Sequence, residues 1–286
     1  MAERIAWVGR VTVPKQPRHR VVRLWTDGEP PGPDTEVEEI ADPFAAATPW
    51  QGGDASANAY HLAHDAAPLP EGLRGPLQQY VLAPPVRPGK IVCVGRNYRA
   101  HAAEMGNEVP EEPLLFFKPS SSLLASGQAL PLPRGYERID MESELVAVIG
   151  RVTTHVTPER ALEHVAGYTL GNDVSNRDLQ RGDKQWTRGK GFDGFAPCGP
   201  FVRLWPPGTA LPGTARIRGY LDDVLCQDSA LDLMIFDLAF VLAYVSRVMT
   251  LEPGDLVYTG TPEGVSALAP GQVVRIELEG VPDRKS

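Results

Sequence analysis

Glu142 and Glu144 stand two residues apart beside an apolar run, Leu145 to Ile149. The run is typical of a β-strand, and side chains two apart on a strand lie on the same face. Two carboxylates side by side repel each other, so a folded protein keeps such a pair either in open solvent or around a cation. The pair alone favours a solvated strand. Neighbouring motifs must decide between this interpretation and a cation site.

Two further segments carry groups that could share such a site. Asp173 ends an apolar run and precedes a dense set of polar residues, and Lys190 lies in a glycine-rich loop that also holds Phe192 and Phe195. Exposed aromatic side chains are costly, so a solvated turn does not explain Phe192 and Phe195 beside Lys190. We expect these aromatics to frame a functional loop.

His101 and Glu104 could form an acid–base pair. They are three residues apart in a helix-like stretch, which places them on one helical face. A histidine held by a carboxylate is a common general base, and the same pair is as often a surface contact. Both interpretations stay open on these residues alone.

The composition limits the classes of partner. Lys and Arg number 28 against 36 Asp and Glu, a net charge of −8, which repels phosphate backbones and argues against nucleic acid. An acidic protein can still bind an anionic substrate where a cation and a few basic side chains reverse the local field. The cysteines Cys93, Cys198 and Cys226 lack metal-site spacing and are predicted to be reduced and mostly buried. No signal-peptide run or membrane span is expected, so we predict a cytoplasmic protein.

Proline density divides the 286-residue chain. Residues 1–84 are rich in turns but alternate like strands at Ile5 to Val13 and Arg20 to Trp25, which predicts a small N-terminal domain. The segment Leu82 to Gly89 is typical of a linker. Residues 85–286 form the predicted catalytic domain.

That second part is predicted to be α+β and mainly β. Its strands are expected at 91–94, 114–117, 145–149, 201–204 and 273–278, with a hairpin turn at 221–224. Helices are expected after Tyr98, at Pro158 to Val165 with Thr157 as cap, and at Phe236 to Met249.

Eight motifs in order resemble those of the fumarylacetoacetate hydrolase family, over about Lys90 to Leu278. They are Gly95-Arg96-Asn97-Tyr98, Phe117-Lys118-Pro119-Ser120, Glu142-Ser143-Glu144-Leu145, Asn172-Asp173-Val174-Ser175, Arg177-Asp178-Leu179-Gln180, Lys190-Gly191-Phe192-Asp193, Met249-Thr250-Leu251-Glu252-Pro253-Gly254-Asp255 and Thr259-Gly260-Thr261-Pro262-Glu263-Gly264-Val265. The resemblance implies a mixed β-sheet roll that is often dimeric, so we expect a homodimer.

The resemblance also implies a site. Glu142, Glu144 and Asp173 would hold Mg²⁺ or Mn²⁺, with Ca²⁺ also possible, since all-oxygen ligation suits a hard cation. The expected catalytic residues are His101 and Glu104, on a mobile lid, and Lys190 beside the metal. Expected substrate contacts are Arg96, Tyr98, Lys118, Arg177, Gln180 and Thr261.

Three functions remain open. A 2-oxo acid that chelates the cation would have its carbonyl polarised and its enolate stabilised, and water activated by His101 would give C–C hydrolysis of acylpyruvate- or fumarylpyruvate-type substrates. Without a positioned water, the same enolate supports isomerisation or decarboxylation of unsaturated 2-hydroxy dicarboxylates or oxaloacetate-type acids. The third is a non-catalytic binding protein. The end of the chain, Glu279 to Ser286, departs from the family pattern and predicts altered packing at that edge.

Overall fold

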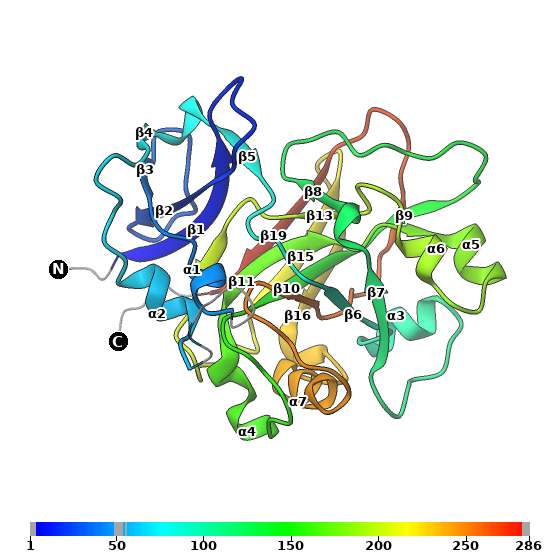
Figure 1. Cartoon of the computed structure of the whole chain (residues 1–286). Coiled ribbons are helices and arrows are strands. Elements are labelled where there is room, and N and C mark those ends of the chain that lie inside the picture. Colours follow the sequence, from blue (N-terminus) through cyan, green and yellow to red (C-terminus); the bar gives the residue numbers. More distant parts are fainter. Residues whose placement is uncertain (1–3, 49–53, 55, 282–286) are drawn as a thin grey trace.

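The fold is built on one large, mostly antiparallel sheet (Figure 1). The computed structural model describes residues 4–48, 54 and 56–281. The main path of the sheet runs β4-β3-β2-β1-β14-β11-β10-β17-β6-β7, with β5, β8 and β13 attached beside it. These strands are β1 (Ile5–Thr12), β2 (Arg20–Thr26), β3 (Glu36–Glu39), β4 (Arg74–Pro76), β5 (Val81–Ala83), β6 (Ile91–Gly95), β7 (Leu114–Lys118), β8 (Leu123–Ala125), β10 (Ser143–Ile149), β11 (Val165–Asn172), β13 (Ala196–Cys198), β14 (Val202–Leu204) and β17 (Leu256–Tyr258).

Two smaller sheets complete the β structure. One has the order β12-β9-β18 and the other the order β16-β15-β19. Their strands are β9 (Ile139–Met141), β12 (Ser175–Asn176), β15 (Arg216–Leu221), β16 (Val224–Ala230), β18 (Ser266–Ala267) and β19 (Val274–Glu279). The predicted hairpin joins β15 to β16 through Asp222 and Asp223, both with positive φ, as a tight type I′-like turn requires.

The helices are short. They are α1 (Pro43–Ala46), α2 (Ala59–His64), α3 (Arg99–Glu104), α4 (Pro158–Ala161), α5 (Arg177–Gly182), α6 (Thr187–Lys190) and α7 (Leu238–Val248). The longest, α7, begins after Asp237, whose carboxylate accepts from the Phe240 amide at 2.8 Å. Figure 1 shows α7 beside α4 below the sheet, where its buried side chains Val241, Leu242 and Val245 pack on the core.

The centre of the sheet explains the apolar runs in the sequence. Every residue of β10 is buried, because the strand pairs with β11 and β17 and is covered on both faces. A strand buried on both faces needs a continuous apolar run rather than alternation. Polar groups at its start, where Ser143 and Glu144 lie, are therefore costly unless they serve a site.

The N-terminal strands continue the same sheet. Strand β1 pairs with β14, and Ala6 and Val8 share a buried cluster with Val146 and Val148 of β10. A separate cluster that includes Val11, Val22, Leu24 and Val37 packs inside the N-terminal part. One core thus spans residue 84, and the other lies almost entirely before it, with Phe201 as its one later buried member. The predicted domain boundary at residue 84 stays a prediction.

Two local expectations are wrong. The predicted helix from Pro158 to Val165 ends at Ala161, because Leu162–His164 forms a 3₁₀ turn and Val165 pairs with Ile149 as the start of β11. Thr157 occupies the cap position, but its side chain makes no capping bond. The linker begins after Ala83, since Leu82 pairs with Val11 inside the sheet.

The cysteines are free, as expected, and differ in accessibility. Burial raises the pKa of Cys93 well above its usual value and that of Cys198 to about 12, whereas Cys226 is partly exposed. We expect iodoacetamide, added to the folded protein, to alkylate Cys226 and neither of the other two cysteines, because a buried, protonated thiol is a poor nucleophile. Peptide mass spectrometry checks this, and rapid labelling of Cys93 in the folded protein would contradict it.

No helix in the described ranges has the length and apolar character that a membrane span requires. The end of the chain can be followed only in part: β19 ends at Glu279, and Val281 packs against the core cluster around α7. The remainder of the atypical tail, residues 282–286, lies outside the described residues.

Candidate metal centre

Three buried carboxylates meet at the ends of β10 and β11. Glu142, Glu144 and Asp173 each have an oxygen within 4.8 Å of the others and are at most 3% exposed. Glu142 lies between β9 and β10, and Asp173 directly follows β11. The three carboxylates that the sequence analysis named as ligands are therefore adjacent in space.

The backbone fixes the relative position of these two strand ends. The Asp173 amide donates to the Glu142 carbonyl at 2.9 Å, and the Glu142 amide donates to the Asn172 side-chain oxygen at 2.8 Å. The next pair in register is Ser143 opposite Asn172. Two ligand candidates from different strands are thus held by hydrogen bonds that do not use their carboxylates.

Glycine supports the third carboxylate. The Gly260 amide donates to Glu144 Oε2 at 2.8 Å, with Gly260 at φ +99°, a conformation that other residues rarely adopt. A Cβ there would also lie 2.6 Å from the Asn97 side chain. Any other residue at this position would disturb the hydrogen bond to Glu144.

Two buried lysines offset the negative charge. Lys118 Nζ donates to Asp173 Oδ1 at 2.5 Å and to the Val174 carbonyl at 3.2 Å. Lys190 Nζ donates to Glu142 Oε2 at 2.7 Å and Asp173 Oδ2 at 2.5 Å. Each lysine is 2% exposed, so its charge is tolerated only because it is paired.

The carboxylates experience opposite electrostatic environments. Burial alone would raise the pKa of Glu142, but Lys190, Arg177 and His101 hold that pKa well below its usual value. The pKa of Glu144 is raised well above its usual value by burial and by the charges of Asp173 and Glu142. Glu144 therefore carries the repulsion of the cluster, which a bound cation would relieve. An all-oxygen donor set with this crowding fits a hard divalent cation.

Arg177 joins the cluster to a residue that sequence reasoning missed. Its guanidinium donates to Asp140 Oδ2 at 2.8 Å, Glu142 Oε1 at 2.5 Å and Gln180 Oε1 at 2.7 Å. Asp140 is fully buried and also pairs with Arg138. The predicted substrate contacts Arg177 and Gln180 thus bond to each other. The substrate roles of both stay predictions.

Asp140→Asn should destabilise the fold by about 3 kcal/mol, because it removes one of the two carboxylates that pair with the buried Arg177 guanidinium. Urea unfolding of the metal-free protein checks this value. Asp183→Asn is the matched control, since Asp183 pairs with Arg188, which is largely exposed, and such surface pairs contribute little. Equal losses in the two variants would contradict the role of Asp140.

The predicted acid–base pair also forms. His101 is 5% exposed, and its Nδ1 lies 3.4 Å from Glu104 Oε2 on α3. The Glu104 carboxylate accepts from the Gly264 amide at 3.1 and 3.2 Å, which fastens α3 to the loop after β17. After Lys190 and Arg177, His101 is the next charge that lowers the pKa of Glu142.

The remaining expected contacts differ in what they can offer. The Thr261 hydroxyl donates to the Ser143 carbonyl at 3.0 Å and accepts from Gln227 Nε2 at 2.8 Å. Tyr98 is buried at the start of α3, where burial raises its pKa. Arg96 is half-buried next to Trp186. The substrate roles of all three remain predictions.

Lys190 contacts an aromatic ring from another part of the chain, and the phenylalanines of its own loop pack with each other. Phe195 is fully buried in a small cluster with Ile139 and Val174, against which Phe192 packs. The ring under Lys190 Nζ is Phe116 of β7, at 4.8 Å from the centroid. Spacing along the chain could not reveal this contact, because β7 lies more than seventy residues earlier in the sequence.

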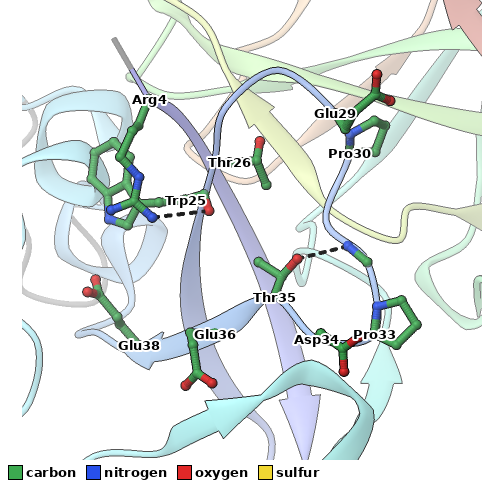
Figure 2. Close-up of a pocket in the computed structure, with 11 residues that line it drawn as sticks. Arg4, Trp25, Thr26, Glu29, Pro30, Pro33, Asp34, Thr35, Glu36 and Glu38 are labelled. Carbon is green, nitrogen blue, oxygen red and sulfur yellow. Dashed lines mark hydrogen bonds between the residues drawn. The ribbon is translucent and has the colours of Figure 1, made fainter. Parts of the chain in front are cut away.

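Two hollows lie outside the carboxylate cluster. Figure 2 shows one of about 640 Å³, lined by residues between Arg4 and Glu38, where the Thr35 hydroxyl accepts from the Gly32 amide. Another, of about 790 Å³, lies between segments 124–132 and 268–276 and reaches Gly171 and Asn172. Neither includes a carboxylate of the metal centre.

Comparison with known proteins adds a family. Residues 90–285 match the model of the fumarylacetoacetate (FAA) hydrolase C-terminal family. The chain is similar to a crystal structure of 2-hydroxyhepta-2,4-diene-1,7-dioate isomerase from Mycobacterium marinum, with 32% identity, a TM-score of 0.77 and coverage of 96% of this chain and 94% of that one.

Two further relatives carry other names. A fumarylpyruvate hydrolase from Pseudomonas aeruginosa, solved with Mn²⁺ and pyruvate, is 40% identical with a TM-score of 0.61, over 69% of this chain and 87% of that one. A mitochondrial oxaloacetate tautomerase from Xenopus laevis is 38% identical over 208 residues, 70% of this chain and 65% of its own. The fold of the present chain, its ordered motifs and the extent of these matches show that it belongs to the fumarylacetoacetate hydrolase family.

Proposed function

We propose that this enzyme is a divalent-metal-dependent hydrolase that cleaves C–C bonds in acylpyruvate- or fumarylpyruvate-type 2,4-dioxo acids. The observation that carries the proposal is the buried group Glu142, Glu144 and Asp173, together with the buried His101 that pairs with Glu104. The relative solved with Mn²⁺ and pyruvate supports this choice of reaction.

The three carboxylates would hold Mg²⁺ or Mn²⁺. When bound, the cation would polarise the 2-oxo carbonyl of the substrate and stabilise negative charge as it develops there. Lys118 and Lys190 keep the ligand oxygens in place, because each bonds to Asp173 and Lys190 also bonds to Glu142. Arg177 holds the other oxygen of Glu142 and so restricts how that side chain can turn.

His101 would act as the general base. Its Nδ1 faces the Glu104 carboxylate, so a proton taken from water at the other ring nitrogen would leave an imidazolium stabilised by Glu104. Because Glu104 is itself held by the Gly264 amide, the carboxylate that orients the His101 ring is fixed in place. The hydroxide so formed attacks the distal acyl carbon, and the C–C bond electrons leave with the pyruvate fragment as its enolate.

The alternative is a tautomerase, isomerase or decarboxylase of 2-oxo acids, such as oxaloacetate. The names of two relatives favour it, and the same carboxylates and lysines would serve. His101 would then move a proton between carbon and oxygen of the substrate without activating water. A non-catalytic protein that only binds a metal would give no turnover at all.

One assay separates these functions. Purified protein is incubated with fumarylpyruvate, acetylpyruvate or oxaloacetate in the presence of Mg²⁺, Mn²⁺ or excess EDTA. The proposal expects pyruvate release from the dioxo acids that EDTA abolishes. Tautomerisation or CO₂ loss from oxaloacetate without pyruvate release from the dioxo acids would favour the alternative. Absence of turnover with every metal would refute the hydrolase and the oxaloacetate alternative.

We also propose a homodimer, as the family resemblance implies. Sedimentation velocity over a range of protein concentrations would detect it as a species of about twice the 31.1 kDa chain mass. A single monomeric species at all concentrations would contradict this proposal without affecting the chemistry above.

A further inference from the structure

The loop after β17 connects the two halves of the site. The amide of Gly260 donates to Glu144 Oε2 at 2.8 Å, and the amide of Gly264 donates to Glu104 at 3.1 and 3.2 Å. Glu144 is one of the three carboxylates of the metal centre, and Glu104 belongs to the acid–base pair on α3. Residues 260–264, here called the bridging loop, therefore join a candidate metal ligand to the candidate base.

Gln227 of β16 holds the bridging loop against the start of β10. Its side chain is fully buried. Its Oε1 accepts from the Ser143 amide at 2.9 Å, and its Nε2 donates to the Thr261 hydroxyl and the Pro262 carbonyl, both at 2.8 Å. The Thr261 hydroxyl in turn donates to the Ser143 carbonyl at 3.0 Å. One glutamine thus closes a ring of hydrogen bonds between the loop and the residue that separates the two glutamates of the metal centre.

A β-bulge aims Gln227 at this place. The register of β15 and β16 shifts by one residue after Gly219, which pairs with Gln227, so that Cys226 is an extra residue on β16. Bulges of this kind redirect a side chain and are common next to active sites. The side chain of Gln227 consequently reaches β10 and the bridging loop together.

Glycines on both sides of Gln227 let the strands come this close. A Cβ at Gly219 would lie 2.2 Å from Ser143 Oγ, and a Cβ at Gly264 would lie 2.0 Å from the Cys226 carbonyl oxygen. Gly264 also has a φ of +91°, which other residues rarely adopt. Larger residues at these positions would push β16 away from β10 or from the bridging loop.

The start of β10 has other supports, but the bridging loop depends on Gln227. Glu142 is fixed by the bond of its amide to Asn172 and by the bond of its carbonyl to the Asp173 amide. The two N–H groups of Gln227, by contrast, bond to two consecutive residues of the loop. Loss of the Gln227 amide should therefore release the loop and Gly264 more than it disturbs the metal ligands.

We propose that Gln227 is a positioning residue, which fixes the bridging loop so that Glu104 and His101 keep a set place relative to the metal centre. This inference rests on the proposed function, in which His101 and Glu104 act on a substrate held at the carboxylates. Gln227 touches no substrate, because it is buried and both its N–H groups are bonded within the protein. It acts through Gly264, whose amide holds the Glu104 carboxylate.

Gln227→Met tests the proposal, because methionine has a similar length and forms none of the three bonds. We expect kcat to fall about 10- to 100-fold with fumarylpyruvate, or with oxaloacetate if the enzyme turns over that acid instead, since a misplacement of about 1 Å has effects of this size. KM and Mn²⁺ affinity should stay within about threefold. Steady-state kinetics and calorimetric Mn²⁺ titration measure these quantities. A loss confined to Mn²⁺ affinity would overturn the proposal.

A second background distinguishes positioning from general damage to the fold. In His101→Ala, the further substitution Gln227→Met should lower the residual rate by less than about twofold, because no base is left to position. The same loss of rate with and without His101 would show that Gln227 does not act through the acid–base pair, and would overturn the proposal.

Hydrogen exchange tests the bridging loop without turnover. In Gln227→Met, the amides of residues 259–265 should exchange about tenfold faster or more than in the wild type, while those of residues 145–149 keep their protection. Unchanged exchange in the loop would refute the role of Gln227. A wild type that turns over no 2-oxo acid would refute the proposed function, and the exchange rates would still decide whether Gln227 holds the loop.

Gln272→Met is the matched control. Gln272 is exposed and bonds to the Ala269 amide and to Asp222, away from the bridging loop, so its loss should change neither kcat nor exchange in the loop. If Gln227→Met does not fold, Gln227→Asn replaces it, because asparagine keeps a buried amide but is one methylene too short to bond to both β10 and the loop. A wild-type rate in Gln227→Asn, or an equal effect of Gln272→Met, would contradict the proposal.

Discussion

Glu144→Gln should reduce turnover on the order of 10³-fold and weaken Mn²⁺ binding by more than about 100-fold. The loss of one direct ligand exceeds the 10- to 100-fold effect typical of residues that only support ligands, and a catalytic cation contributes several kcal/mol to the barrier. The substitution nearly preserves shape, and the amide oxygen can still accept from the Gly260 amide. Calorimetric titration with Mn²⁺ and the pyruvate-release assay measure the two effects.

The same variant should keep or raise the melting temperature of the metal-free protein. In the wild type, burial and the charges of Asp173 and Glu142 oppose ionisation of Glu144, and the neutral amide removes that repulsion. Differential scanning fluorimetry in EDTA measures this. Glu159→Gln, at the exposed start of α4, is the control and should change neither binding nor turnover. Normal Mn²⁺ affinity in Glu144→Gln would refute the metal centre as assigned.

His101→Ala should lower hydrolysis by about 10²- to 10⁴-fold while leaving Mn²⁺ affinity within about threefold. The first effect is the usual contribution of a general base. The second follows because the candidate metal ligands are Glu142, Glu144 and Asp173, and His101 is not one of them. Glu104→Gln should cause a smaller loss, since it removes the partner that orients the imidazole and leaves the imidazole itself. Rates with fumarylpyruvate and Mn²⁺ titrations give both quantities.

His61→Ala on α2 is the control, because His61 is exposed and lies in the N-terminal part of the chain. If His101→Ala hydrolyses the substrate at the normal rate, the base is another group. If it loses hydrolysis and keeps oxaloacetate tautomerisation, then water activation and proton transfer at carbon use different groups in this site.

The sequence alone determined the family, the main-β fold and the three carboxylates. Glu142 and Glu144 are brought together by the period of a strand, which is a local property. The buried strand β10 was evident for the same reason, as an unbroken apolar run between polar ends. Ordered motifs added Asp173, which the spacing of residues could not place beside Glu142.

Local periodicity failed where tertiary pairing overrode it. Val165 follows a helical pattern but forms a strand, because its pairing with Ile149 extends the central sheet. Leu82 looked like part of a linker and pairs with Val11. In both cases the hydrogen bonds come from residues that are distant in sequence.

Only the tertiary structure decided which groups surround the carboxylates. Asp140 lies only two residues before Glu142, yet its bond to Arg177 depends on a helix that begins 37 residues later. The ring under Lys190 is Phe116, and the sequence could not indicate this contact because β7 and α6 meet only in the folded chain. Local spacing therefore predicted that Glu142 and Glu144 share a face, and the resemblance to the family supplied Asp173 and the expectation of a metal. The charges that balance the three carboxylates were not predictable, because they arise from contacts between strands and helices far apart in the sequence.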